Sequence, residues 1–188
     1  MKPITPASPH AIIMVGIPGS GKSTFAEHFA DTFSAPIINE RRIAFEANIN
    51  DKQAELISTV FLDEVLKTNR TFLVEAINLT KAKRNNLIAT VNKAGYRTLI
   101  VWVQTDPTEA KRRALKAQPT GSGLTAVEFD AAVRAFHPPM AQDKATVISG
   151  KHTYATQLKI VLKQLAGSRP DTHVEPPKPR QSGNIVVR

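Results

Sequence analysis

Short apolar runs alternate with amphipathic stretches along most of the chain. The apolar runs are rich in β-branched and aromatic residues and predict five strands, at residues 11–16, 37–39, 71–75, 97–104 and 146–149. Between them, helical periodicity and capping signals predict helices at about 22–33, 40–48, 52–67, 80–94, 106–117, 125–136 and 154–165. Strands that alternate with helices of crossover length predict an α/β fold: a parallel five-stranded sheet with helices on both faces.

Two of these helices have distinctive apolar side chains. Phe25, Phe29 and Phe33 recur every fourth residue and form one apolar face. The helix at 52–67 is predicted by apolar residues with helical periodicity, namely Leu56, Val60, Phe61, Leu62 and Leu66.

The pattern also divides the chain into three parts. Residues 1–10 contain three prolines and are expected to form a loose leader, followed by a single domain at 11–166. Within the domain, a basic helix followed by a loop of glycine and proline predicts a small helical lid at about 111–136. The apolar pattern stops near residue 166, and 167–188 contain four prolines and scattered charges, so we expect a flexible basic tail.

Residues 16–23 match GxxxxGK[ST], the pattern of a phosphate-binding P-loop, between an expected strand and an expected helix. Glycines let successive N–H groups turn toward phosphate oxygens, and the helix adds its positive dipole end. We expect Lys22 to reach the β- and γ-phosphates and the Ser23 hydroxyl to ligate Mg²⁺. The residues expected to bind ATP are Gly16, Pro18, Gly19, Ser20, Gly21, Lys22, Ser23 and Thr24. The motif thus predicts ATP and Mg²⁺ as ligands and a P-loop NTPase-type sheet.

The charge is strongly basic and unevenly placed. The net charge is +9, and residues 81–116 hold nine Lys or Arg against two acids. This balance favours a polyanionic partner such as nucleic acid, the alternative being a solvated surface with cations that handle ATP. The absence of cysteine excludes disulfides, and no apolar run is long enough to span a membrane. We therefore expect a cytoplasmic protein without a membrane partner.

Several polar residues are candidates for the chemistry. Glu75 ends an expected strand, where a Walker-B-type acid would face the metal, and Asn78 follows it, where it either makes a turn or hydrogen-bonds substrate. The basic helix of the lid supplies cations for the departing γ-phosphoryl group, with Arg113 as the catalytic residue and Arg112 and Lys116 beside the nucleotide.

Four runs together give a family resemblance. They are Gly-Ile-Pro-Gly-Ser-Gly-Lys-Ser-Thr, Ile-Ile-Asn-Glu-Arg-Arg, Val-Glu-Ala-Ile-Asn-Leu-Thr-Lys-Ala-Lys-Arg and Asp-Pro-Thr-Glu-Ala-Lys-Arg-Arg. Over about residues 11–165 the chain resembles the polynucleotide-kinase-like P-loop kinases, which include phage 5′-polynucleotide kinases, hydroxymethyl-pyrimidine DNA kinases and, more distantly, zeta-toxin kinases. The resemblance implies a parallel α/β fold with a lid, and transfer of phosphate from ATP–Mg²⁺ to a hydroxyl.

The resemblance leaves the general base open. Family members carry an Asp just after the second strand, where this chain has Glu40, Arg41 and Arg42. Glu40 replaces the Asp after a one-residue shift, whereas a strict alignment puts Arg41 there, and Glu75 is the other candidate base. Arg41 and Arg42 are expected to contact a phosphate of the acceptor.

The leading hypothesis is therefore a kinase that phosphorylates a hydroxyl of nucleic acid, at a 5′ end or on a hydroxymethylated base. In a phage-type system it would act in the host cytoplasm. A small-molecule or nucleoside kinase on the same fold is the first alternative. A nucleotide-binding module that has lost its base is the second.

Overall fold

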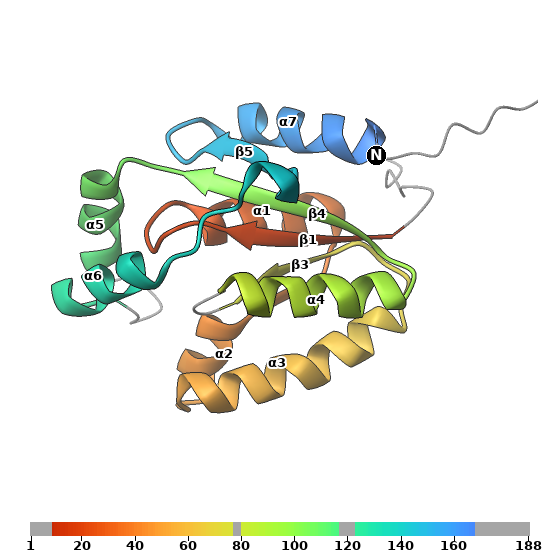
Figure 1. Cartoon of the computed structure of the whole chain (residues 1–188), viewed down its shortest axis with the longest axis horizontal. Coiled ribbons are helices and arrows are strands. Elements are labelled where there is room, and N and C mark those ends of the chain that lie inside the picture. Colours follow the sequence, from red (N-terminus) through yellow and green to blue (C-terminus); the bar gives the residue numbers. More distant parts are fainter. Residues whose placement is uncertain (1–8, 77–79, 117–122, 168–188) are drawn as a thin grey trace, which may run out of the picture.

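The computed structural model describes residues 9–76, 80–116 and 123–167, in which strands and helices alternate (Figure 1). The strands are β1 (His10–Val15), β2 (Ile37–Asn39), β3 (Phe72–Glu75), β4 (Arg97–Gln104) and β5 (Thr146–Ser149). They form one five-stranded sheet in the order β2-β3-β1-β4-β5, and every neighbouring pair is parallel. The predicted α/β fold with a parallel five-stranded sheet is confirmed.

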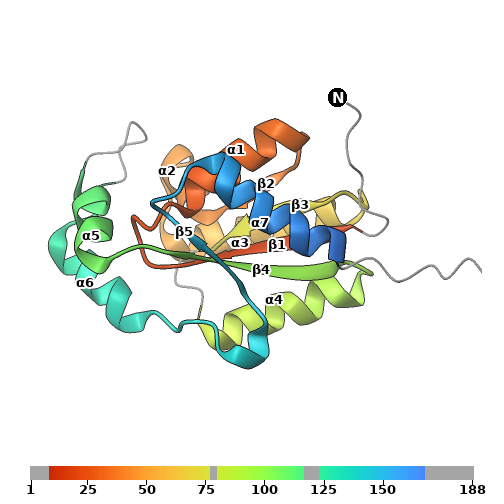
Figure 2. The ribbon, with the colours of Figure 1, turned by 90° about the horizontal axis from the view of Figure 1, so that it is seen from above.

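The helices cover both faces of this sheet (Figure 2). They are α1 (Lys22–Phe33), α2 (Glu40–Glu46), α3 (Asp51–Leu66), α4 (Lys81–Lys93), α5 (Pro107–Leu115), α6 (Ala126–Ala135) and α7 (Tyr154–Gly167), with a short 3-10 helix, η1 (Ala141–Asp143). Helices α1 and α7 pack on one face, and α3 and α4 pack on the other. Because the strands are covered on both sides, they are nearly continuous apolar runs.

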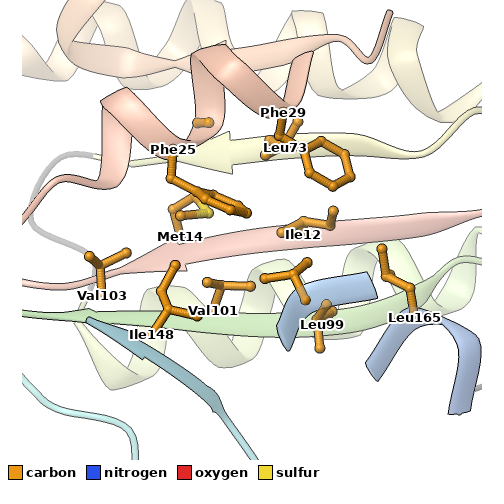
Figure 3. Packing of buried hydrophobic residues seen from close by; sticks show 12 residues of the cluster. Ile12, Met14, Phe25, Phe29, Leu73, Leu99, Val101, Val103, Ile148 and Leu165 are labelled. Atoms are coloured by element: carbon orange, nitrogen blue, oxygen red, sulfur yellow. The ribbon is translucent and has the colours of Figure 1, made fainter. Parts of the chain in front are cut away.

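The larger part of the core lies between the sheet and the α1–α7 layer (Figure 3). Phe25 and Phe29 of α1 and Leu165 of α7 meet Ile12 and Met14 of β1, and all five side chains are buried. This packing holds α1 against the sheet, and α1 begins at the end of the loop that follows β1. The P-loop therefore lies between two elements, β1 and α1, that are anchored in this buried cluster.

Helix α3 differs from its sequence pattern. Leu56 and Val60 share the helical periodicity of its apolar residues, yet they are 64% and 62% exposed. The fully buried positions are Ala54 and Ser58, while Leu62 packs partly buried against the core of the α3–α4 face. The helix carries apolar residues on two sides, and only one of them can face the sheet.

The boundaries of the domain also shift slightly. His10, expected in the leader, is the first residue of β1 and is 2% exposed. Residues 1–8 and 168–188, which hold most of the expected leader and tail, lie outside the described residues, as do 117–122 within the expected lid. Helices α5 and α6 pack together through Ala110, Ala114 and Phe129. They lie beyond the carboxyl ends of the strands (Figure 1). Among the described helices, none is both long and apolar enough to cross a membrane.

Candidate active site

The P-loop runs from β1 into α1 and lies close to backbone on two sides. Gly19 has a φ of 72°, and a Cβ there would collide with the carbonyl oxygen of Ala110 in α5. A Cβ at Gly16 would lie 2.6 Å from the carbonyl oxygen of Val103 in β4. Side chains at these two positions would therefore disturb the loop, which is shaped by its neighbours as well as by its own sequence.

The start of α1 is open to an anion. Its N-cap is Gly21, with a φ of 106° and no side chain to accept a hydrogen bond from the first turn. The amides of that turn are thus available to phosphate oxygens, as are those of the glycine-rich loop. Pro18 and Thr24 line the same cavity as these glycines, whereas Ser20 is fully buried and its carbonyl accepts a hydrogen bond from the Thr105 hydroxyl at 2.8 Å.

The ammonium group of Lys22 is folded onto the loop. Its Nζ donates to the carbonyl oxygens of Gly16 at 3.0 Å and Ile17 at 3.1 Å, and lies 3.9 Å from Oε1 of Glu75. Burial lowers the pKa of Lys22, the charge of Glu75 partly opposes this shift, and Arg41 adds to the lowering. Lys22 is therefore a desolvated cation next to a carboxylate, positioned where the P-loop would hold phosphates.

Glu75 connects the P-loop to the neighbouring strand. Its Oε1 accepts a hydrogen bond from the Ser23 hydroxyl at 2.9 Å, and its Oε2 accepts one from Nδ2 of Asn39 at 3.1 Å. Asn39 and Glu75 are paired at the ends of β2 and β3 in the parallel register. A hydroxyl and a carboxylate are the hard oxygen donors that Mg²⁺ prefers, so these residues fit the expected metal. Asn39 was not predicted as a site residue from the sequence, although its position at the end of a predicted strand could have indicated it.

The carboxylate of Glu40 contacts helix α3. Glu40 is the first residue of α2, is 8% exposed, and its Oε1 accepts a hydrogen bond from the Ser58 hydroxyl of α3 at 3.1 Å. It is not among the residues that line the cavity, whereas Arg41 and Arg42 are. Glu40 thus bonds to α3, while the next two residues, Arg41 and Arg42, face the cavity. Of the two candidate carboxylates, Glu75 is the one that lines the cavity.

The arginines of α5 also differ in whether they line the cavity. Arg113 lines the cavity, with Nε donating to Glu109 at 2.7 Å and Nη1 donating to the carbonyl of Gly150, after β5, at 3.0 Å. Arg112 forms two hydrogen bonds of 2.7 Å with the same Glu109 and does not line the cavity, nor does Lys116 at the end of α5. Hydrogen bonds from both arginines hold the pKa of Glu109 at about 2. Glu109 was not identified from the sequence, although its spacing to both arginines is that of helical ion pairs.

These groups surround one cavity of about 630 Å³. The P-loop and Arg113 form one part of its wall, and Asn39, Arg41, Arg42 and Phe45 form another, with Glu75 between them. Four residues at or beside α6 complete the wall: Leu124, Ala132, Ala135 and Phe136. Hydrogen bonds from Thr125 lower the pKa of Glu128 in α6, and the charge of Arg41 adds to this shift. The charge of Arg41 thus lowers the pKa of both Lys22 in the P-loop and Glu128 in α6. Asn78, the remaining candidate, lies outside the described residues.

The basic stretch at 81–116 is not a uniform free surface. Five of its nine cations form ion pairs, namely Lys83–Glu55, Arg84–Asp143, Lys111–Asp130, Arg112–Glu109 and Arg113–Glu109. Arg84 is fully buried and joins α4 to η1. Three of the nine cations are therefore paired with acids that are distant in the sequence, while Arg112 and Arg113 share the nearby Glu109.

Solved structures share this fold. A gluconokinase from Sinorhizobium meliloti 1021 has 17% identity and a TM-score of 0.61, over 85% of this chain and 93% of that one. Chaetomium thermophilum Kti12 in complex with ADP-AlF3 has 14% identity and a TM-score of 0.63, over 83% and 97%. The Mycobacterium tuberculosis APS kinase CysC in complex with AMPPNP and APS has 18% identity and a TM-score of 0.59, over 87% and 100%. At these identities the likeness concerns the fold.

The sequence itself matches a family model. No curated protein matches the chain significantly. Residues 12–139 match the model described as an AAA domain, and this segment includes the P-loop, Glu75 and Arg113. Because the match covers more than half of the chain, the protein belongs to this AAA domain family of P-loop proteins.

Proposed function

We propose that the protein is an ATP-dependent kinase that transfers the γ-phosphoryl group to a hydroxyl of an anionic acceptor. The observation that carries this proposal is the position of Glu75 in the cavity wall. Its carboxylate contacts the P-loop residue Ser23 at 2.9 Å and Asn39 at the end of β2 at 3.1 Å. A carboxylate between a phosphate-binding loop and a pair of arginines suits proton removal from an acceptor hydroxyl.

The P-loop side would hold the donor. Backbone amides of the P-loop and of the first turn of α1 would bind the phosphates, and Lys22 would leave its carbonyl partners for the β- and γ-oxygens. Magnesium, held by the Ser23 hydroxyl and through water by Glu75, would neutralise charge on the phosphates. Exchanging two carbonyl contacts for phosphate oxygens requires only side-chain motion of Lys22.

The α2 side would hold the acceptor. Arg41 and Arg42 would bind its anionic group, and the ring of Phe45, which is 46% exposed and lines the same cavity, would contact its apolar part. Glu75 would accept the hydroxyl proton as the acceptor oxygen bonds to the γ-phosphorus. The bond between that phosphorus and the bridging oxygen breaks, and ADP leaves with the electron pair.

The lid would stabilise charge during transfer. Arg113 lines the cavity and is held at its two ends by Glu109 and the Gly150 carbonyl. A guanidinium fixed before the reaction stabilises developing charge with little reorganisation. We assign this role to Arg113 and not to Arg112, which bonds to Glu109 but does not line the cavity.

Nucleic acid is the acceptor class that we propose first, at a 5′-hydroxyl end or a hydroxymethylated base. The support is the net charge of +9 together with two arginines in the acceptor wall. An anionic small molecule is the second candidate. It is favoured by the ion pairs that five of the nine cations at 81–116 form with four acids, which leave less free positive surface for a long polyanion.

A transfer assay tests the proposal. The protein is incubated with Mg²⁺ and γ-labelled ATP, with a 5′-hydroxyl oligonucleotide, hydroxymethylated DNA, phosphorylated sugars, mononucleosides or no acceptor. Label on either DNA supports the first acceptor class, and label only on phosphorylated sugars supports the second. Label on neutral mononucleosides alone would contradict an anionic acceptor. ATP binding without any transfer would instead indicate a nucleotide-binding module.

Two matched variants test the assignment of residues. Arg42 and Arg112 are both exposed helical arginines paired with a nearby glutamate, but only Arg42 lines the cavity. Arg42→Ala is expected to raise the KM of the acceptor by roughly tenfold or more, as for loss of a charged hydrogen bond, while Arg112→Ala leaves it unchanged. Equal effects of the two variants would refute the acceptor role of α2.

A further inference from the structure

Helix α3 presents an apolar face to solvent. Leu56, Ile57 and Val60 are 64%, 37% and 62% exposed, and their spacing puts them side by side on the helix. Phe61 is 51% exposed, but its side chain lines a cavity with residues of α1 and α2. We call Leu56, Ile57 and Val60 the α3 patch. In the part of the chain that the structure describes, no element lies beyond α3 on its outer side (Figure 1). Contiguous exposed apolar side chains of this kind mark interaction surfaces.

Charged residues end one row of this face. Lys52, Leu56, Val60 and Asp63 follow one another at helical spacings of four, four and three residues, so they form a single ridge. The ridge reads cation, apolar, apolar, anion. Lys52 and Asp63 are exposed, and among the described residues neither forms an ion pair. Lys67 follows Asp63 one turn further on; its pKa is raised by its hydrogen bond to Glu64, and the charge of Asp63 adds to this shift. Read in the reverse direction, the same ridge has the complementary charge at each position.

We propose that the α3 patch joins two copies of this chain through an antiparallel pair of α3 helices. In this arrangement Lys52 lies opposite the partner's Asp63, Leu56 lies opposite the partner's Val60, and the same contacts recur on the other side of a two-fold axis. A surface that complements itself after a half-turn is what an isologous dimer requires. A parallel pair would instead place like charges together at both ends of the ridge, which costs free energy.

Charge reversal tests the pairing directly. The dimer dissociation constant of the full chain is measured by sedimentation velocity over a series of concentrations. Lys52→Glu alone and Asp63→Lys alone each create two repulsive contacts per dimer and are expected to weaken association by roughly tenfold. The combined variant restores both contacts and is expected to return to within about threefold of wild type. A combined variant as weak as the single ones would overturn the antiparallel pairing.

The apolar part has its own test with a matched control. Val60→Glu is expected to make the protein monomeric, while Val127→Glu, at a 75% exposed apolar position of α6, leaves the dimer intact. Circular dichroism melts establish that both variants fold.

Cross-linking locates the axis. The chain has no cysteine, so Leu56→Cys introduces a single thiol. With Lys52 opposite the partner's Asp63, the axis crosses the ridge between Leu56 and Val60, so the thiols at position 56 of the two copies lie close together. Oxidation should link two copies, whereas Val127→Cys should not link. A wild-type protein that is monomeric at every concentration would overturn the proposal. An increase of hydrogen exchange at residues 168–188 in monomeric Val60→Glu would also overturn it. That result would mean that residues 168–188 of the same chain, and not a second copy, cover the patch.

Discussion

The most informative single change is Glu75→Gln. It preserves the size of the side chain and its oxygen facing Ser23, but removes a charge that lies 3.9 Å from the Lys22 ammonium. The two side chains are only 12% and 13% exposed, so their attraction is on the order of 4 kcal/mol at an effective dielectric constant of about 20. If Glu75 accepts the acceptor proton, kcat should fall by roughly 10²- to 10⁴-fold. That loss corresponds to about 3–5 kcal/mol of activation free energy.

The pH dependence of kcat/KM in Glu75→Gln is expected to shift in a defined direction. Burial lowers the pKa of Lys22 and Glu75 raises it, so removing the carboxylate should lower the pKa of Lys22 further. The alkaline limb of kcat/KM, where Lys22 loses its proton, should therefore move to lower pH in Glu75→Gln. Initial rates with γ-labelled ATP across pH give both quantities, and calorimetric titration gives the affinity for ATP.

A suitable control is Glu64→Gln, which removes a carboxylate that also pairs with a lysine, Lys67, at 2.6 Å on the surface of α3. It should leave kcat and the pH profile unchanged. If kcat of Glu75→Gln stays within about threefold of wild type, Glu75 is neither the base nor a ligand of the metal shell, since such groups contribute far more.

Three further changes have defined outcomes. Arg113→Ala should lower kcat by roughly 10²-fold, as for loss of a preorganised donor, with Arg112→Ala near wild type in the same transfer assay. Glu109 has a folded pKa of about 2 against an ordinary value of 4.5, so its stabilising contribution is complete above the ordinary value and is lost as pH falls through the folded one. The melting temperature of Glu109→Gln should therefore lie below wild type at neutral pH and converge with it near pH 2, and a gap that persists in acid would contradict this. Gly19→Ala forces a Cβ into the Ala110 carbonyl at a φ of 72°, so unfolding by denaturant should show a loss of roughly 1–3 kcal/mol with ATP affinity reduced.

The sequence was sufficient to predict the order of strands and helices because those signals are local. Period-two and helical patterns, the Asp106 and Thr125 caps, and the P-loop spacing each depend on neighbours within a few residues, and the helix caps are present as expected. The parallel sheet followed from the alternation of elements. The donor side of the candidate site was predictable for the same reason, since one motif contains nearly all of it.

The acceptor side was not predictable to the same degree. Glu40, Arg41 and Arg42 are adjacent in the sequence, and only the packing of α2 against α3 determines that Glu40 faces Ser58 while the arginines face the cavity. Likewise, the role of Asn39 depends on the register of β2 beside β3, which brings it to Glu75. Asn39 and Glu75 are 36 positions apart, so the sequence around neither residue indicates that the two side chains meet.

By itself, then, the sequence determined a P-loop, an α/β alternation and a set of candidate charges. The tertiary structure alone decided which charges act together: it paired three of the nine cations at 81–116, Lys83, Arg84 and Lys111, with acids distant in the sequence, and it placed Arg113 but not Arg112 in the cavity wall. It also left Leu56 and Val60, which belong to the apolar pattern that predicts α3, exposed to solvent. The physical reason is that helical periodicity reports the existence of an apolar face, whereas burial and charge pairing depend on which surfaces meet in three dimensions.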